Sequence, residues 1–233
     1  MIYCFVNIIQ GHMSYNIAID GPAGAGKSTI AKTLAKNLSF IYVDTGAMYR
    51  ALAVFFIRQG LDKDNEEGIC AAVKNATVTI EYKDGVQQVI LNGENVTPYL
   101  RTEEVGNMAS ASSVYGPVRA HLLELQQSIA RENDVIMDGR DIGTCVLPNA
   151  DLKIYLTASV EERARRRYTE LVEKGENPDI EKIKKDIEER DYRDMHRDIA
   201  PLKQADDAIL VDSSNMTIDE VVETIASHVK KNR

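Results

Sequence analysis

The stretch of residues 17–29 places the strongest constraint on how this chain folds. It consists of a short apolar run, a glycine-rich turn and the start of an amphipathic helix, and residues 21–28 match G-x-x-x-x-G-K-[ST] at every position. Glycines leave backbone N–H groups unshielded, and the N-terminus of the following helix adds partial positive charge. The alternative, a plain glycine-rich strand-to-helix turn, is disfavoured by this strand–loop–helix context. The sequence therefore predicts a phosphate-binding loop made of Gly21, Pro22, Ala23, Gly24, Ala25, Gly26, Lys27, Ser28 and Thr29.

Polar residues in and near this loop suit the binding of a nucleoside triphosphate with Mg²⁺. Lys27 is expected to reach the β- and γ-phosphates, and the Ser28 hydroxyl is expected to ligate Mg²⁺. Asp138 ends an apolar strand and is predicted to hold the same metal, directly or through water. A turn aspartate that caps a strand end is the alternative for Asp138, and the same ambiguity holds for Asp44.

Short apolar runs alternate with helical periodicity along most of the chain. Helices are expected after Ser28, over residues 47–57, over most of 102–132 and over 217–229. This alternation predicts an α/β fold with a parallel sheet, in which ligands bind at the carboxyl edge of the strands. The five predicted strands are residues 16–20, 40–43, 134–138, 152–156 and 208–211.

Two segments depart from this alternation. Residues 76–82 and 88–91 flank turn signals and predict a small antiparallel hairpin inside a subdomain of about residues 62–100, with a surface excursion as the alternative. Residues 161–203 carry many charges of both signs, which is typical of a solvated helix pair. Their arginines gather on either side of a tip at residues 174–178, and this distribution favours a lid that closes over phosphates.

Arginines near the predicted strand ends indicate a second anion site. Arginine binds phosphate oxygens in a bidentate manner. Several arginine side chains placed close together raise the free energy of the folded state unless an anion lies between them. Two anion sites are what phosphoryl transfer between two phosphorylated molecules requires. His196 is interpreted as a surface histidine, because an ionised phosphate acceptor is already a nucleophile and needs no base. The arginines concerned are Arg50, Arg119, Arg140, Arg190 and Arg197.

Composition argues against several other kinds of protein. A net charge of −8 does not favour non-specific binding to nucleic acid, and no apolar run approaches the roughly 18 residues of a membrane span. Cys4, Cys70 and Cys145 lack C-x-x-C spacing, so a reduced, cytoplasmic compartment is expected. Residues 1–13 end in Gln-Gly-His-Met and are interpreted as a cloning remnant before a native start at Met13, with a genuine N-terminal extension as the alternative.

Five segments together resemble the bacterial cytidylate kinases over about residues 16–229. The phosphate loop alone is generic, whereas the segments that begin at Asp44 and Asp138 are much more specific to the family. The segments are Ile19-Asp-Gly-Pro-Ala-Gly-Ala-Gly-Lys-Ser-Thr29, Asp44-Thr-Gly-Ala-Met-Tyr-Arg50, Leu100-Arg-Thr102 with Ser110, Asp138-Gly-Arg-Asp-Ile-Gly-Thr144, and Glu189-Arg-Asp-x-Arg-Asp-x-x-Arg197 followed by Ala200-Pro-Leu202.

The resemblance implies the nucleoside-monophosphate kinase fold, an α/β fold with a five-stranded parallel sheet flanked by helices. It implies a single kinase domain at residues 14–233, with a monophosphate-binding insertion at about 45–112 that carries a small antiparallel sheet, and a helical lid at about 163–198. The implied activity is transfer of the γ-phosphate of ATP to CMP or dCMP with Mg²⁺, by a monomer.

The resemblance also implies roles for individual residues. Those expected to act in catalysis are Lys27, Arg140, Arg163, Arg167 and Arg197. Arg50, Arg140 and Arg197 would hold the monophosphate, Ser110, Arg119 and Asp141 would read cytosine, and Arg190 and Asp194 would touch the sugar. The CMP-binding set is completed by Thr45, Tyr49 and Arg101, and the family often has serine at the position of Thr45. Ser28 and Asp138 form the metal set.

Other functions stay open at this point. Another small P-loop kinase, acting on a different monophosphate or on a hydroxyl acceptor, is the main alternative. A nucleotide-dependent switch lacks the guanine signature Asn-Lys-x-Asp and leaves the arginines without a role. A dinucleotide-binding domain is disfavoured, because Thr29 stands where the third glycine of G-x-G-x-x-G is needed.

Overall fold

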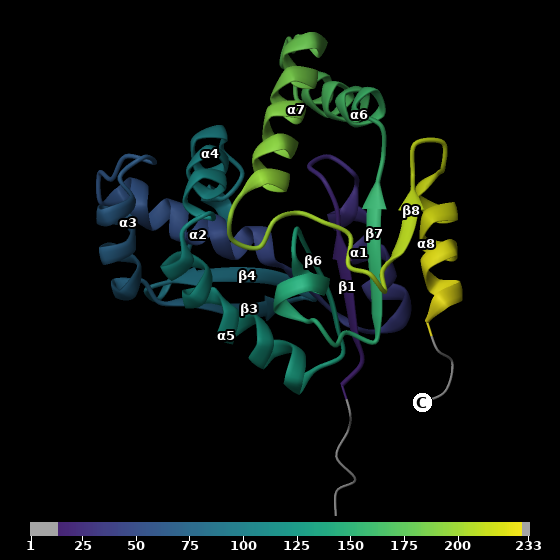
Figure 1. Ribbon diagram of the computed structural model, residues 1–233, viewed down its shortest axis with the longest axis horizontal. Coiled ribbons are helices and arrows are strands. Elements are labelled where there is room, and N and C mark those ends of the chain that lie inside the picture. The colour runs from purple at the N-terminus through teal and green to yellow at the C-terminus, as the bar shows by residue number, and fades with distance from the viewer. Residues whose placement is uncertain (1–13, 230–233) are drawn as a thin grey trace, which may run out of the picture.

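The strand that leads into the phosphate loop lies at the centre of a five-stranded parallel sheet (Figure 1). This computed structural model describes residues 14–229. Residues 1–13, which the sequence analysis interprets as a cloning remnant, lie outside the described residues. The strand order is β2-β6-β1-β7-β8. The strands are β1 (Asn16–Asp20), β2 (Ile41–Asp44), β6 (Val135–Gly139), β7 (Leu152–Thr157) and β8 (Ile209–Asp212). The predicted parallel α/β sheet is confirmed, with each strand within one residue of its expected bounds at either end.

Helices cover both faces of this sheet because successive strand residues point to opposite sides. Ile17 and Ile19 of β1 face α1 (Lys27–Leu38) and α8 (Ile218–His228) in one apolar cluster. Ala18, between them, belongs to a second cluster on the opposite face. That face is covered by α2 (Thr45–Arg58), α4 (Glu103–Ser112) and α5 (Gly116–Glu132). The result is a three-layer arrangement in which the loop after β1 lies at the carboxyl edge of the sheet.

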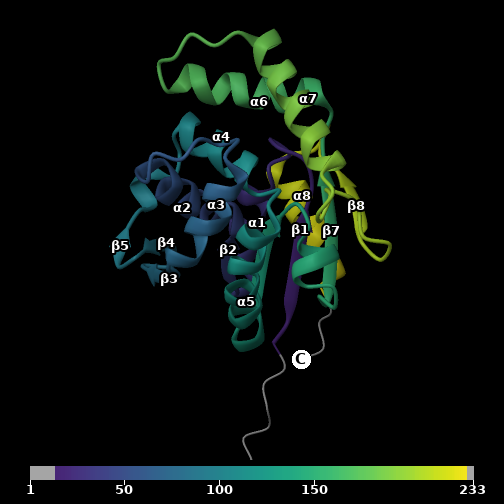
Figure 2. The ribbon, with the colours of Figure 1, turned by 60° about the vertical axis from the view of Figure 1, so that its left-hand side comes forward.

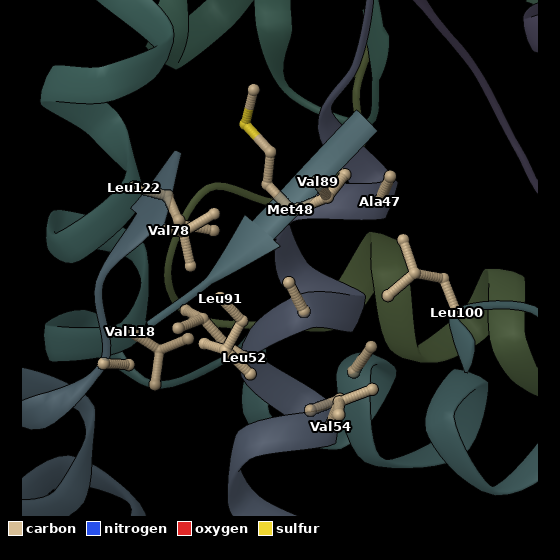
Figure 3. Packing of buried hydrophobic residues seen from close by; sticks show 14 of the residues in the cluster. Ala47, Met48, Leu52, Val54, Val78, Val89, Leu91, Leu100, Val118 and Leu122 are labelled. Carbon is tan, nitrogen blue, oxygen red and sulfur yellow. The ribbon is translucent and has the colours of Figure 1, made fainter. Parts of the chain in front are cut away.

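The predicted hairpin is part of a separate three-stranded antiparallel sheet, β3 (Val78–Lys83), β4 (Val86–Leu91) and β5 (Glu94–Asn95). It packs on α2 through buried residues such as Leu52, Val89 and Leu91 (Figure 3). The short helix α3 (Glu66–Ala72), which was not expected from the sequence, precedes this sheet. The buried contact with α2 argues against a merely decorative surface excursion.

The charged region forms the helix pair α6 (Val160–Glu173) and α7 (Ile180–His196), joined at the predicted tip. Both helices stand above the carboxyl ends of the strands in two views (Figures 1 and 2). Ala164, Ile183 and Ile187 form a small apolar cluster between them, and most other residues are polar. Arg163 and Asp191, one from each helix, contact Ala23 of the phosphate loop, and the role of the pair as a lid stays a prediction.

The structure confirms a mostly helical stretch over residues 102–132. It is divided into α4 and α5 at residues 113–115, and Pro117 lies in the first turn of α5, where its missing N–H costs nothing. None of the helices within residues 14–229 combines the length and apolar character that a membrane span needs.

Candidate active site

The phosphate loop packs tightly against the neighbouring strand β7. Gly21 has a φ of +148°, and a Cβ on it would lie 1.9 Å from the carbonyl oxygen of Leu156. Any side chain would therefore push the loop off the sheet. Lys27 begins α1 and is buried, with its Nζ donating to the carbonyl of Pro22 at 2.7 Å.

The Asp138 carboxylate accepts hydrogen bonds from hydroxyl groups of two other elements. Ser28 Oγ donates to Oδ2 of Asp138 at 2.8 Å, and the Tyr42 hydroxyl donates to Oδ1 at 2.9 Å. Burial, reinforced by the charge of Asp44, raises the pKa of Asp138 to about 6. The structure thus brings the two predicted metal residues together, while their role as ligands stays a prediction. Tyr42 was not foreseen, because nothing in an apolar strand sequence marks its hydroxyl as a partner of Asp138.

Several cations near the loop lie close enough to lower one another's pKa, although Asp44, Asp138 and Asp194 lie among them. Burial, and next the charge of Arg140, lower the pKa of Lys27 well below its usual value. The same two causes lower the pKa of Arg190 to about 10, and its buried Nε has no hydrogen-bond partner. Burial, and next Arg101, lower the pKa of Arg50. Arg140 differs from these residues, because its Nε donates a hydrogen bond to the Asp194 carboxylate at 2.8 Å.

Cations that repel one another in this way suit the binding of an anion. Cations that depress one another's pKa repel, and a bound phosphate relieves both the repulsion and the missing hydrogen bond. The charges of Arg140 and Arg190 act on Lys27, and Arg50 lies close enough to act on Arg190, although the three arginines come from different elements.

Asp141 links the predicted base-reading residues to the predicted phosphate-binding ones. It forms an ion pair with Arg119 and a second one with Nη2 of Arg197 at 3.0 Å. Arg119 also donates to the carbonyl of Ser113 at 3.3 Å and lies 5.8 Å from the Tyr49 ring centroid. Ser110 is half-buried on α4, where its carbonyl accepts from the Ser113 hydroxyl. Carboxylate, guanidinium and hydroxyl groups here can donate to and accept from a heterocyclic base.

Two residues of the predicted CMP-binding set make contacts within the protein. The Thr45 side chain is buried, and its hydroxyl donates to the carbonyl of Asp138 at 2.7 Å, which ties α2 to β6. Arg101 donates to Asp44 at 2.8 Å and is largely exposed at the rim. The backbone of Asp44 is in turn held by both ends of the Gln87 side chain, at 2.8 and 3.2 Å. No sequence pattern marks this contact between the small sheet and β2.

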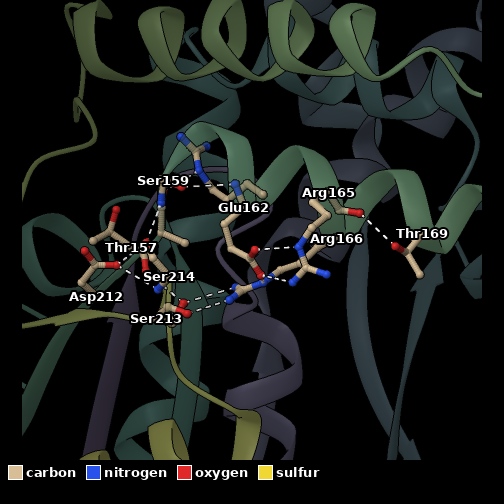
Figure 4. A network of polar contacts seen from close by, with 11 residues as sticks. Thr157, Ser159, Glu162, Arg165, Arg166, Thr169, Asp212, Ser213 and Ser214 are labelled. Carbon is tan, nitrogen blue, oxygen red and sulfur yellow. Dashed lines mark hydrogen bonds and ion pairs between the residues drawn. The ribbon is translucent and has the colours of Figure 1, made fainter.

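The lid arginines differ sharply from one another. Arg163 is buried and binds Asp191 and the carbonyl of Ala23. Arg167 is exposed and pairs with Glu170 on its own helix, so the structure does not bring it to the site. Arg166 was not predicted as a site residue. It donates to Oγ and the carbonyl of Ser213, after β8 (Figure 4). Its Nη1 also lies close to Gly26.

Comparison with known proteins is consistent with this geometry. The family model described as cytidylate kinase matches residues 17–231. A cytidylate kinase from Leuconostoc mesenteroides is 50% identical over 219 residues, covering 94% of this chain and 98% of the relative. One from Listeria monocytogenes is 51% identical over 211 residues, covering 91% and 94%. An uncharacterized protein from Eubacterium ventriosum has a solved structure with a TM-score of 0.51 at 10% identity, covering 94% of this chain and all of that one, which indicates a shared fold.

Proposed function

The chain belongs to the cytidylate kinase family, and on that premise we propose that it transfers the γ-phosphate of ATP to CMP or dCMP, giving ADP and CDP or dCDP. The observation that carries this proposal is the group of cations opposite the phosphate loop. Arg190 has a buried donor without a partner, and Arg50 makes no ion pair within residues 14–229. Two phosphate-bearing substrates would supply the missing negative charge.

The oxygen groups at Asp138 fit Mg²⁺. Magnesium prefers hard oxygen ligands and is usually held by one or two protein groups together with substrate phosphates. The Ser28 hydroxyl and the Asp138 carboxylate, already 2.8 Å apart, would hold it. When bound, Mg²⁺ neutralises charge on the phosphates of ATP.

The chain's own residues would then align and neutralise the reacting groups. Lys27 would bind the β- and γ-phosphates, and the arginines would hold the acceptor phosphate in line. The acceptor is already an anion, so no catalytic base is needed. The proposed phosphate-binding arginines are Arg50, Arg140 and Arg197.

Cytosine would be read where Arg119 and Asp141 meet, with Ser110 nearby on α4. Its exocyclic amine needs an acceptor and its carbonyl needs a donor, and both kinds of group are present. Uracil presents the opposite group at its C4 edge and would leave a buried partner unsatisfied. UMP is therefore proposed to be a weaker acceptor. Arg190 and Asp194 would contact the sugar.

Residues 45–112 are proposed as the acceptor-binding insertion and residues 163–198 as the lid of a single domain. Action as a monomer is part of the same proposal. A cytoplasmic location is supported by Cys70 and Cys145, which are free thiols.

A coupled ADP-release assay with a panel of nucleoside monophosphates tests this function. Wild-type protein is expected to turn over CMP and dCMP faster than UMP and AMP. Lys27→Ala is expected to lose turnover, whereas Arg197→Ala is expected to impair use of CMP and to retain most ATP binding. The matched control is Arg131→Ala, which removes an exposed arginine of α5. Rapid turnover of AMP or UMP without CMP would overturn the proposal, and unchanged CMP kinetics in Arg197→Ala would show that the acceptor site is misplaced.

A further inference from the structure

A buried ion pair joins the two lid helices. Arg163 lies in the first turn of α6 and Asp191 lies in α7, with side chains only 5% and 10% exposed. Arg163 Nη1 is 2.6 Å from Asp191 Oδ2. Removing two charges from water is costly unless their remaining hydrogen-bonding groups also find partners. Arg163 Nε does so at the carbonyl of Ala158, at 2.9 Å.

Both members of the pair also bind the same residue of the phosphate loop. The N–H of Ala23 donates to Asp191 Oδ1 at 3.2 Å, and the carbonyl of Ala23 accepts from Arg163 Nη1 at 2.8 Å. The two side chains therefore hold Ala23 on either side through its own backbone. Through this residue the loop is attached to α6 and α7 at once.

This attachment determines the direction of a neighbouring amide. The carbonyl of Ala23 and the N–H of Gly24 belong to one planar trans peptide, so they point in opposite directions. By holding the carbonyl, Arg163 fixes the direction of the Gly24 N–H. Gly24 has a φ of +76°, and a Cβ on it would lie 3.3 Å from Cβ of Arg163, which shows how closely the loop and α6 approach. The directions of such amides determine how well a loop binds phosphate.

We propose that Arg163 and Asp191 are positioning residues that fix the Ala23–Gly24 peptide of the phosphate loop to the lid helices, so that ATP affinity depends on this pair. This assigns Arg163 a different role from the catalytic one expected from the sequence, because its Nε and Nη1 donors are used within the protein. The proposal rests on the proposed function for the identity of the nucleotide. It predicts a selective effect on ATP, since the two side chains form hydrogen bonds with Ala23, Ala158 and each other, and none of these residues is predicted to bind CMP.

Equilibrium titration with MgATP and, separately, with CMP tests the pair without depending on turnover. Asp191→Asn is expected to weaken ATP binding about tenfold, which equals about 1.4 kcal/mol, and to change CMP binding less than twofold. Arg163→Met is expected to behave alike. The double variant is expected to lose about tenfold as well, rather than a hundredfold, because the two residues act as one unit. Lys184→Met, which removes an exposed ion pair on α7, is the control and is expected to bind ATP normally.

Two results would overturn the proposal. One is ATP affinity within twofold of wild type in Asp191→Asn. The other is equal weakening of ATP and CMP, which would indicate general structural damage. If Asp191→Asn does not fold, the double variant replaces it in the same titration, because it leaves no unpaired buried charge. A wild-type protein that binds ATP but does not phosphorylate CMP would refute the proposed function and leave these titrations valid.

Discussion

Arg190 is expected to destabilise the protein when no ligand is bound. Its pKa falls from 12.5 to about 10, first because of burial and then because of Arg140, and its Nε is buried without a partner. At 1.36 kcal/mol per pKa unit, this corresponds to about 3 kcal/mol. The side chain is only half-buried, so we discount the figure for solvent screening to about 1–2 kcal/mol.

The perturbation is Arg190→Met, which removes the charge and keeps the apolar stem. It is expected to raise the free energy of unfolding of the ligand-free protein by about 1–2 kcal/mol, or Tm by about 2–8 °C for a chain of this size. The same change is expected to weaken CMP binding at least tenfold, because a charge-assisted bond is lost. Below about pH 10 the arginine is protonated in both states, so the gain is expected to be constant from pH 6 to 9.

Urea denaturation without ligand, followed by the same titration with CMP present, provides the measurement. CMP is expected to stabilise the wild type more than the variant, because only the wild type binds it well. Arg131→Met removes an exposed arginine and is expected to change the free energy of unfolding by less than about 0.5 kcal/mol. A ligand-free Arg190→Met protein that is less stable than wild type would refute the idea that the cations repel.

Three further predictions concern the side chains of Asp138, Asp20 and Gln87. Asp138→Asn is expected to reduce turnover at least about a hundredfold and to raise the Mg²⁺ concentration needed for half-maximal rate. A titration of initial rates with Mg²⁺ measures both effects. Chelation of Mg²⁺ is expected to abolish turnover of the wild type. The pKa of Asp20 is raised to about 6, chiefly by burial, so the folded state binds more protons than the unfolded state between about pH 4 and 6. The unfolding free energy of wild type relative to Asp20→Asn is therefore expected to fall by about 2 kcal/mol from pH 4 to 7, and an unchanged difference in denaturant titrations would contradict this. Gln87→Ala removes the side-chain partners of the buried N–H and carbonyl of Asp44. It is expected to lower the free energy of unfolding by about 1–3 kcal/mol and to raise KM for CMP more than KM for ATP. Gln88→Ala, on the opposite face of β4, serves as the control.

Local sequence patterns predicted the elements of the sheet well. Strands such as β1 and β6 are short apolar runs because both of their faces are covered by helices, and this burial is visible in composition alone. The helix α3 was missed because its seven residues carry too little periodicity to stand out. The division between α4 and α5 falls just before Pro117, a residue type that interrupts helices.

The site was predicted in part, and the differences have a physical cause. A loop such as residues 21–28 works through its own backbone, so its sequence is enough to identify it. Arg163 and Arg167 look alike in the sequence, yet one is buried against Ala23 and the other is exposed to solvent. Which of two arginines one helical turn apart faces the loop depends on how the whole helix packs.

The sequence by itself determined the phosphate loop, the parallel sheet and the set of arginines available to a second anion, because each depends on residue type and local spacing. Only the tertiary structure decided which polar side chains contact each other directly: Ser28 with Asp138, Asp141 with Arg119 and Arg197, and Asp191 with Arg163. These partners lie 22 to 110 residues apart in the chain. Their meeting follows from the order of strands in the sheet and from the packing of the lid helices, which no local pattern encodes.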